Sequence, residues 1–138
     1  MRVSQRLDYT LRMLVALARL PVGATVGSGD LAVSLGLPRR FGEQQMTSLA
    51  KTGLVGSRRG TGGGVVLGRP AASITALEVV RAVQGEALDV PRSVGSATTE
   101  LWADVASVLE NRLASTTLAD LALRQVELDA TDGPMYFI

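Results

Sequence analysis

The sequence predicts a mainly α-helical fold that carries one small β-hairpin. Apolar residues recur at helical spacing through most of the chain, which predicts a series of amphipathic helices. The spacing changes over residues 54–67, where two short strand-like runs flank a glycine-rich segment. With 138 residues, of which 46% are apolar and 20% charged, the chain has the composition of a globular protein with a single core.

Three helices are expected in the first 53 residues. A proline or glycine follows each of them and ends it, which places them over residues 5–20, 28–35 and 39–52. Ser28 is expected to cap the second helix, with Asp30 in its first turn. Pro38 suits the first turn of the third helix, because a backbone N–H is not needed there. Gly53 has the position of a glycine that closes a helix.

A hairpin and a capped helix are expected next. The hairpin pairs residues 54–57 with residues 65–67 across the glycine-rich tip. A helix over residues 76–84 follows, since Thr75 and Glu78 have the spacing of a capping box.

The chain divides into four parts. Residues 1–85 form the first region, and residues 86–98 form a loop without periodicity. Residues 99–129 hold a pair of helices, one over about 99–114 and one that begins near Thr117. Residues 130–138 form a tail that is expected to be mobile.

Charge is divided unequally between the two halves of the chain. Residues 1–70 hold ten Lys or Arg and three acidic residues, whereas residues 71–138 hold four Arg and ten acidic residues. The first half therefore carries about +7 and the second about −6. A basic half favours a polyanionic partner. The alternative is that each half only solvates itself.

The residue types present exclude several kinds of chemistry. The chain has neither cysteine nor histidine, which removes thiolate nucleophiles, disulfides, serine–histidine–aspartate triads and cysteine-rich metal sites. No paired carboxylates stand out as a catalytic acid and base, so we expect no enzyme. No apolar run approaches the roughly 18 residues of a membrane span. A signal peptide is not evident either, which favours a cytoplasmic protein with no membrane partner.

Three helices followed by a two-stranded wing are typical of a winged helix-turn-helix, in which the third helix lies in the major groove of DNA. The start of the third helix holds side chains that can face bases: Arg39, Arg40, Glu43 and Gln44. Lys51, at its other end, is expected to contact a phosphate. The alternative is an arginine pair solvated at an ordinary helix end.

The wing has its own candidate contacts. Arg58 and Arg59 are expected to bind phosphates, and Gly60 follows them in a segment whose glycines let the backbone approach another surface closely. A cradle for a small nucleotide is the alternative. However, the segment lacks the Lys-Ser/Thr pair of a P-loop and precedes a strand rather than a helix.

The helix near 99–114 has an apolar stripe wider than one packing face needs. We expect this stripe to form a dimer interface, since a dimer matches a two-fold symmetric operator. The alternatives for Trp102 are a core position and, less favoured, a platform for a ligand. The expected interface residues are Leu101, Trp102, Val105, Val108, Leu109 and Leu113.

The ordered set of motifs resembles the Rrf-two family of bacterial regulators, which contains the IscR- and NsrR-like iron–sulfur sensors. The resemblance covers residues 1 to about 122. It implies a homodimer whose long helices pair and whose third helix and wing contact DNA. The matching motifs are Met1-Arg2-Val3-Ser4, Leu31-Ala32, Leu35-Gly36-Leu37, Glu43-Gln44, Gly53-Leu54-Val55, Arg59-Gly60, Gly63-Gly64, Leu67, Arg69-Pro70, residues 74–85, Leu101-Trp102 and residues 115–121.

The chain departs from this family at several positions. The family's sensors place three cysteines in the part that corresponds to about 86–100, and this chain has none, so we expect no iron–sulfur cluster and no other cofactor. Asp8 lies where some members supply a further cluster ligand. Gly42 and Gln45 replace apolar residues, which predicts two lost core anchors and a loosely seated third helix. The wing has Gly62 and Val65 where a basic and an aromatic residue are common.

These observations predict a homodimeric DNA-binding transcription regulator, most simply a repressor, that reads a roughly palindromic operator with residues 39–52 and 54–67. Its expected partners are double-stranded DNA and a second copy of itself. Its input is left open between an unidentified small-molecule effector near the dimer helices, a protein partner and none. The alternative is an interaction protein that keeps the fold and has lost specific DNA reading.

Overall fold

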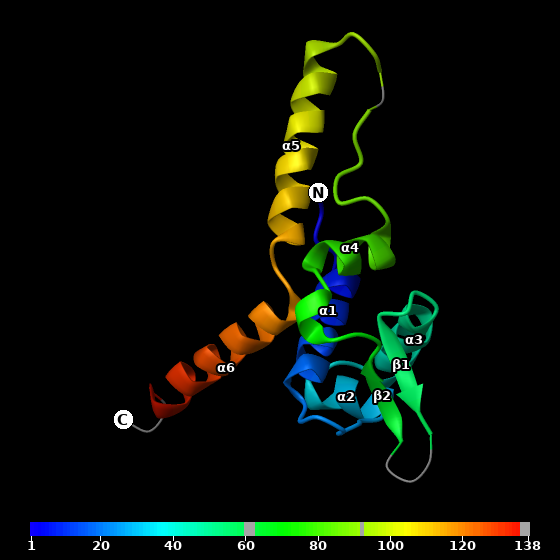
Figure 1. The fold of residues 1–138 in the computed structure, drawn as a ribbon, viewed down its shortest axis with the longest axis vertical. Helices are drawn as coiled ribbons and strands as arrows, with labels where there is room; N and C mark the ends of the chain where they lie inside the picture. The colour runs from blue at the N-terminus through cyan, green and yellow to red at the C-terminus, as the bar shows by residue number, and fades with distance from the viewer. Residues whose placement is uncertain (60–62, 92, 136–138) are drawn as a thin grey trace.

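The computed structural model describes residues 1–59, 63–91 and 93–135, with the backbone alone over 132–135. These parts of the chain form six α-helices, a 3-10 turn at Ala71–Ser73 and one antiparallel hairpin (Figure 1). The mainly helical fold with a small hairpin is confirmed. In chain order the elements are α1 (Gln5–Arg19), α2 (Ser28–Ser34), α3 (Arg39–Ala50), β1 (Val55–Arg58), β2 (Gly64–Leu67), α4 (Ala76–Gln84), α5 (Ala97–Ala114) and α6 (Leu118–Met135).

Helix α1 is the central element of the core. It packs against α2, α3, α4, α6 and β2, and Met13 and Leu14 are completely buried between them. Ser4 caps the helix, since its hydroxyl accepts a hydrogen bond from the backbone N–H of Leu7 at 3.1 Å. The core is otherwise aliphatic and runs from α1 to the start of α6.

Helix α2 begins at Ser28, one residue earlier than it would if Ser28 were its cap, so the predicted cap was wrong. The N-cap is Gly27, and no side chain bonds the first turn. The physical reason is the extended residue before it: Val26 forms an antiparallel bridge with Val65, and the Val65 N–H donates to the Val26 carbonyl at 2.8 Å. The chain therefore stays extended through Gly27, and Ser28 becomes the first helical residue.

Helix α3 ends at Ala50, two residues before the predicted end. Thr52 turns its hydroxyl back to the Leu49 carbonyl at 2.6 Å, and Gly53 adopts a left-handed φ of +83°. Pro38 is the N-cap of the helix rather than part of its first turn.

The hairpin is short and is braced by the segment that precedes α2. β1 pairs with β2 from Val55↔Leu67 to Arg58↔Gly64. Gly64 lies against the backbone of Val26 so closely that any Cβ there would collide with the Val26 carbonyl, which requires glycine. The predicted contact at Gly60 falls in residues 60–62, outside the described residues.

The start of α4 is tied to the turn between α5 and α6. The predicted capping box is present: the Thr75 hydroxyl accepts from the Glu78 N–H, and the Glu78 carboxylate accepts from the Thr75 N–H. Two backbone hydrogen bonds join this start to the later turn. The Ala76 N–H donates to the Thr116 carbonyl at 2.8 Å, and the Leu118 N–H donates to the Ile74 carbonyl at 2.9 Å.

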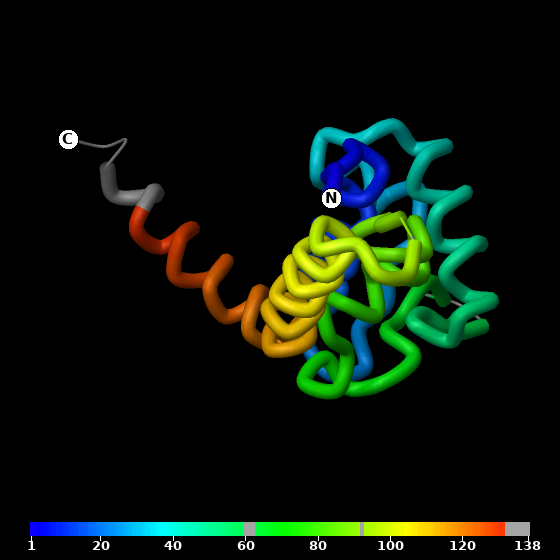
Figure 2. Tube along the Cα trace, turned by 90° about the horizontal axis from the view of Figure 1, so that it is seen from above, coloured from blue at the N-terminus to red at the C-terminus, as the bar shows by residue number. Residues whose placement is uncertain are grey.

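Helices α5 and α6 extend away from the compact part of the fold. α5 has no buried residue and begins at Ala97, two residues before the predicted start, whereas α6 reaches outward from α1 (Figures 1 and 2). No helix within the described residues has the length and apolar character needed to cross a membrane.

Helix α6 continues to Met135, beyond its predicted end near Asp129. The mobility expected of residues 130–138 stays a prediction. Bonds near its far end support the extra turn. The Thr131 hydroxyl donates to the Glu127 carbonyl, and Asp129 accepts from Gln125 at 2.9 Å and pairs with Arg19 at 2.8 Å. Residues 136–138 lie outside the described residues.

Candidate nucleic-acid interface

One face of α3 is exposed along its whole length. Arg40, Gln44, Thr47 and Lys51 follow one another at intervals of four, three and four residues, so they form a single outward stripe. The opposite face is buried and consists of Gly42, Met46 and Leu49. Three of these four residues were predicted from the sequence. Thr47 was not, although helical spacing places it on the same face as Arg40.

The other two candidates on α3 lie at its edge, toward α2. The Arg39 guanidinium forms an ion pair with the Asp30 carboxylate at 2.9 Å. Arg39 and Glu43 both cover Gly29, since a Cβ added there would come within 2.7 Å of the Arg39 side chain and 2.9 Å of Glu43 Oε1. The structure thus separates the four predicted base-facing residues into an outward pair, Arg40 and Gln44, and an edge pair.

Gly42 is a packing requirement, so the prediction of a lost core anchor was wrong. The residue is buried, and an added Cβ would come within 2.6 Å of both Ala32 Cβ and the Ser28 carbonyl oxygen. Glycine therefore lets α2 and α3 approach more closely than any other residue would. Tyr9 and Phe41 support the same seating from α1, with their rings edge to face and 5.8 Å apart between centroids.

Gln45 also takes part in packing. It is half-buried, and its Oε1 lies 3.5 Å from the hydroxyl of Thr10, which is completely buried on α1. Gln45 thus accepts a hydrogen bond from a buried hydroxyl, where an apolar residue would only make an apolar contact. Gly42 and Gln45, the two departures from the family pattern on α3, therefore both serve the packing of this helix.

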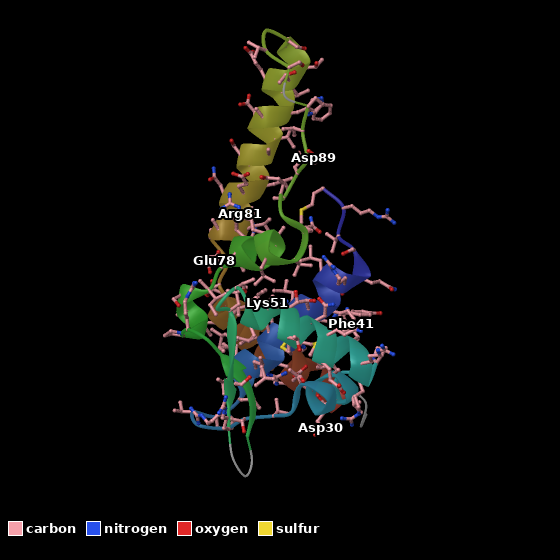
Figure 3. All side chains as sticks on the ribbon, turned by 90° about the vertical axis from the view of Figure 1, so that its right-hand side faces the viewer. Asp30, Phe41, Lys51, Glu78, Arg81 and Asp89 are labelled. Carbon is pink, nitrogen blue, oxygen red and sulfur yellow. The ribbon has the colours of Figure 1, made fainter. Side chains whose placement is uncertain are left out.

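Arg58 and Arg59 occupy the end of β1 where the hairpin leaves the body of the protein. Both are exposed. Arg58 donates from Nη1 to the Gly23 carbonyl at 3.1 Å, so its position is tied to the segment between α1 and α2. Lys51 lies at the end of α3 nearest the wing (Figure 3). Val65, the wing departure within the described residues, is buried and bridges to Val26.

Charge distinguishes this face from the far end of the molecule. Residues 28–67 hold five basic and two acidic residues, a net charge of about +3. Residues 97–131, which form α5 and most of α6, hold two basic and six acidic residues, about −4. A polyanion is therefore attracted to α3 and the wing rather than to the C-terminal helices.

The predicted dimer residues remain largely uncovered in the single chain. Leu101, Trp102 and Val108 are 53%, 45% and 68% exposed, which is unusual for large apolar residues on one helix. Val105 and Leu109 are half-buried. Leu113 packs against the core of its own chain, at the end of α5 that meets α4.

The donor set of the loop before α5 does not fit an iron–sulfur cluster. Such clusters are held by thiolates, sometimes with histidine, and the whole sequence contains neither. No three carboxylates converge as metal ligands in the described parts of the chain. Asp8 instead forms an ion pair with Arg12, one helical turn away, at 3.0 Å.

Comparison with known proteins agrees with this geometry. Residues 3–124 match the Rrf2 family, described as "Iron-dependent Transcriptional regulator". The HTH-type transcriptional regulator IscR of Citrobacter koseri is 33% identical over 141 residues, which cover 96% of this chain and 86% of that protein.

Two solved structures are similar as well. CymR, the global cysteine regulator of B. subtilis, superposes with a TM-score of 0.80 at 31% identity over 90% of this chain and 98% of that one. IscR of T. potens gives 0.76 at 32% identity over 91% and 88%. These relatives are transcriptional regulators rather than enzymes. The chain is a DNA-binding winged-helix regulator and belongs to the Rrf2 family of transcriptional regulators.

Proposed function

We propose that the protein is a homodimeric repressor that reads a roughly palindromic operator with α3 and the wing. One observation carries this proposal most directly. A continuous exposed stripe on α3, from Arg40 to Lys51, lies beside a hairpin whose end carries Arg58 and Arg59, within the basic part of the chain. Helix and wing together can span a major groove and the phosphates that flank it.

The site residues have different roles in this proposal. Arg40 and Gln44 read base edges, because guanidinium and amide groups bond guanine and adenine in the major groove. Arg39 and Glu43 act at the edge of the same reading surface. Lys51 and the two wing arginines, Arg58 and Arg59, contact phosphates, which orient the protein on the duplex. Gly60 belongs to the same wing contact.

The dimer forms through the exposed stripe of α5. Leu101, Trp102 and Val108 leave an apolar surface that a second copy of the same helix would remove from water. Two-fold pairing gives two reading helices related by symmetry, which corresponds to a palindromic operator. Repression follows when the bound dimer occupies DNA that the polymerase needs.

We further propose that this regulator works without an iron–sulfur cluster or other cofactor, since it lacks the thiolates that hold one. Its input is then an unidentified small molecule or a partner protein. As a regulator of transcription it acts in the cytoplasm, where the DNA that it binds is located.

The test is selection of bound duplexes from a randomised library, followed by binding titrations of the selected duplex at several salt concentrations. Lys51, Arg58 and Arg59 from two protomers neutralise up to about six phosphates, so log K should fall with log salt at a slope near −5. A selected site with two-fold symmetry supports the dimer. A weak salt response together with no enriched sequence would exclude the proposed reading function.

A further inference from the structure

Arg69 follows the wing directly and belongs to the basic half of the chain, so its charge alone would make it a further phosphate contact. Although it lies at the surface and is 42% exposed, the side chain is bonded to other residues of the same chain instead. Its Nη2 donates to Glu78 Oε2 at 2.6 Å and to the Ser73 carbonyl at 2.5 Å, and its Nε lies 3.5 Å from the Ser73 hydroxyl. One guanidinium therefore joins the end of β2 to the start of α4.

The carboxylate that receives Arg69 is itself held in place. Glu78 Oε2 also accepts from the Thr75 backbone N–H at 3.4 Å as part of the capping box. The helix behind it is anchored, because Leu77 and Val79 are buried in the core. Figure 3 shows Glu78 near the root of the wing. Arg69 is thus paired with a surface carboxylate whose position is set by the capping box.

The strand end before Arg69 is held from the other side. The Gly68 N–H donates to the Leu54 carbonyl at 2.9 Å, and a Cβ at Gly68 would collide with the Gly53 carbonyl. These contacts fix the root of β2 against the turn that follows α3. Gly68 thus sets the wing relative to α3, and Arg69 sets it relative to α4.

We propose that Arg69 is a positioning residue for DNA binding: its clamp on Glu78 and Ser73 sets the angle at which the wing meets the duplex. A two-stranded hairpin is only marginally ordered by itself, so the course of its strands depends on braces such as the Val26 bridge and the Arg69 clamp. The proposal rests on the proposed contact between wing and DNA. It differs from a phosphate contact in that the Arg69 guanidinium is paired with a carboxylate of the same chain.

A double-mutant cycle separates the two roles. Arg69→Gln removes the clamp's charge, and Glu78→Gln removes its partner while keeping an oxygen that can cap α4. The cycle is measured with the selected duplex at several salt concentrations. We expect each single variant to weaken binding about threefold to fivefold, the double variant to bind no worse than the weaker single, and the salt slope to stay unchanged.

A phosphate contact gives a different pattern, which would overturn the proposal. Arg69→Gln would then lower the salt slope by about 0.9 per site, Glu78→Gln would leave binding unchanged or tighter, and Arg69→Lys would restore it. In the clamp, Arg69→Lys does not restore binding, because the lysine ammonium ends one bond short of Nη2, the atom that donates to both Glu78 and Ser73, and lysine has no counterpart of Nε. Arg81→Gln is the control, since it removes the same charge from α4 away from the wing and should bind normally.

Hydrogen exchange in the free protein tests the clamp without DNA. We expect the amide of Gly68, at the wing root, to exchange several times faster in Arg69→Gln and in Glu78→Gln than in the wild type, while core amides of α1 stay protected. Unchanged exchange at the wing root would overturn the clamp even if the wild-type protein binds DNA. Faster exchange in the variants, together with no DNA binding by the wild type, would support the clamp and exclude the proposed function in DNA binding.

Discussion

Gly42 on α3 lies so close to Ala32 on α2 that a Cβ added to the glycine would come within 2.6 Å of the Ala32 Cβ. The Ser28 carbonyl oxygen lies equally near, and as backbone it cannot turn away. The close approach of α2 and α3 therefore depends on a glycine in the first turn of α3.

Replacing Gly42 by Ala should destabilise the protein, although alanine is the better helix former. The propensity gain of about 1 kcal/mol is outweighed by overpacking, which costs typically about 1–3 kcal/mol and pushes α2 and α3 apart. Urea unfolding measures the net change. Ser48→Ala, at an exposed position of α3, is the control and should be neutral or slightly stabilising. A Gly42→Ala protein more stable than the wild type would contradict the packing argument.

Asp30→Asn should strengthen binding to DNA of any sequence. Asp30 is exposed beside the start of α3 and pairs with Arg39 at 2.9 Å, so it lowers the positive charge that this end of the helix presents to phosphates. We expect affinity to rise about twofold to fivefold at low salt and the gain to shrink at high salt. Asp89→Asn makes the same charge change in the loop far from α3 (Figure 3) and should have no effect.

Arg40 and the wing arginines should respond differently to alanine. Arg40→Ala removes a side chain from the outward stripe of α3, so the preferred sequence should change by about 1–3 kcal/mol at one base pair. The double change Arg58→Ala and Arg59→Ala should weaken binding to all sequences and reduce the salt slope. Library selection and salt titration measure these effects. Arg124→Ala on α6, the control, should bind normally, and a change of preference from the wing variant would contradict the assigned roles.

Val108→Glu should convert the proposed dimer to a monomer. Val108 is 68% exposed on α5, so in a single chain the glutamate would be solvated and the fold unaffected. Buried between two copies of α5, the paired charges would be strongly unfavourable. Light scattering measures the oligomeric state, and circular dichroism checks the fold. Ser107→Glu, one residue away on another face of α5, should remain dimeric. If Val108→Glu and Ser107→Glu were both dimeric, the exposed stripe of α5 would be excluded as the interface.

Asp129 should titrate below the ordinary range of an aspartate. The hydrogen bond from Gln125 lowers the pKa of Asp129 most, and the hydrogen bond and charge of Arg19 lower it further, against an opposing effect of desolvation. Because the folded pKa is depressed, the ionised carboxylate stabilises the α1–α6 contact above the unfolded value of 3.8, and this contribution is lost as the pH falls through the folded pKa. Carboxyl NMR titration measures it, and Gln125→Ala should raise the value.

Local signals in the sequence predicted the helices well because they act within a few residues. The Thr75–Glu78 capping box formed as expected, and Gly36, Gly53 and Gly85 take positive φ angles at helix ends. These are interactions of the backbone with its immediate neighbours. Errors arose where a distant segment intervened, as at Ser28, whose neighbour Val26 pairs with the wing.

The candidate site was only partly predictable, since its residue types are local but their partners are not. Helical spacing identifies the exposed stripe of α3. It does not reveal that Arg39 pairs with Asp30, or that Gln45 accepts a hydrogen bond from a buried threonine of α1. For the same reason Gly42 was predicted to weaken the seating of α3. A glycine that permits close approach of two helices and one that weakens a helix cannot be told apart in the sequence.

The sequence by itself determined the order of helices and hairpin, the division into a basic and an acidic half, and the lack of ligands for a cluster. These depend on residue type and near spacing. Only the tertiary structure decided which arginines point away from the protein and which pair with its own carboxylates, as Arg69 does at the root of the wing. A guanidinium carries the same charge everywhere, and its role depends on whether folding brings a carboxylate within about 3 Å of it.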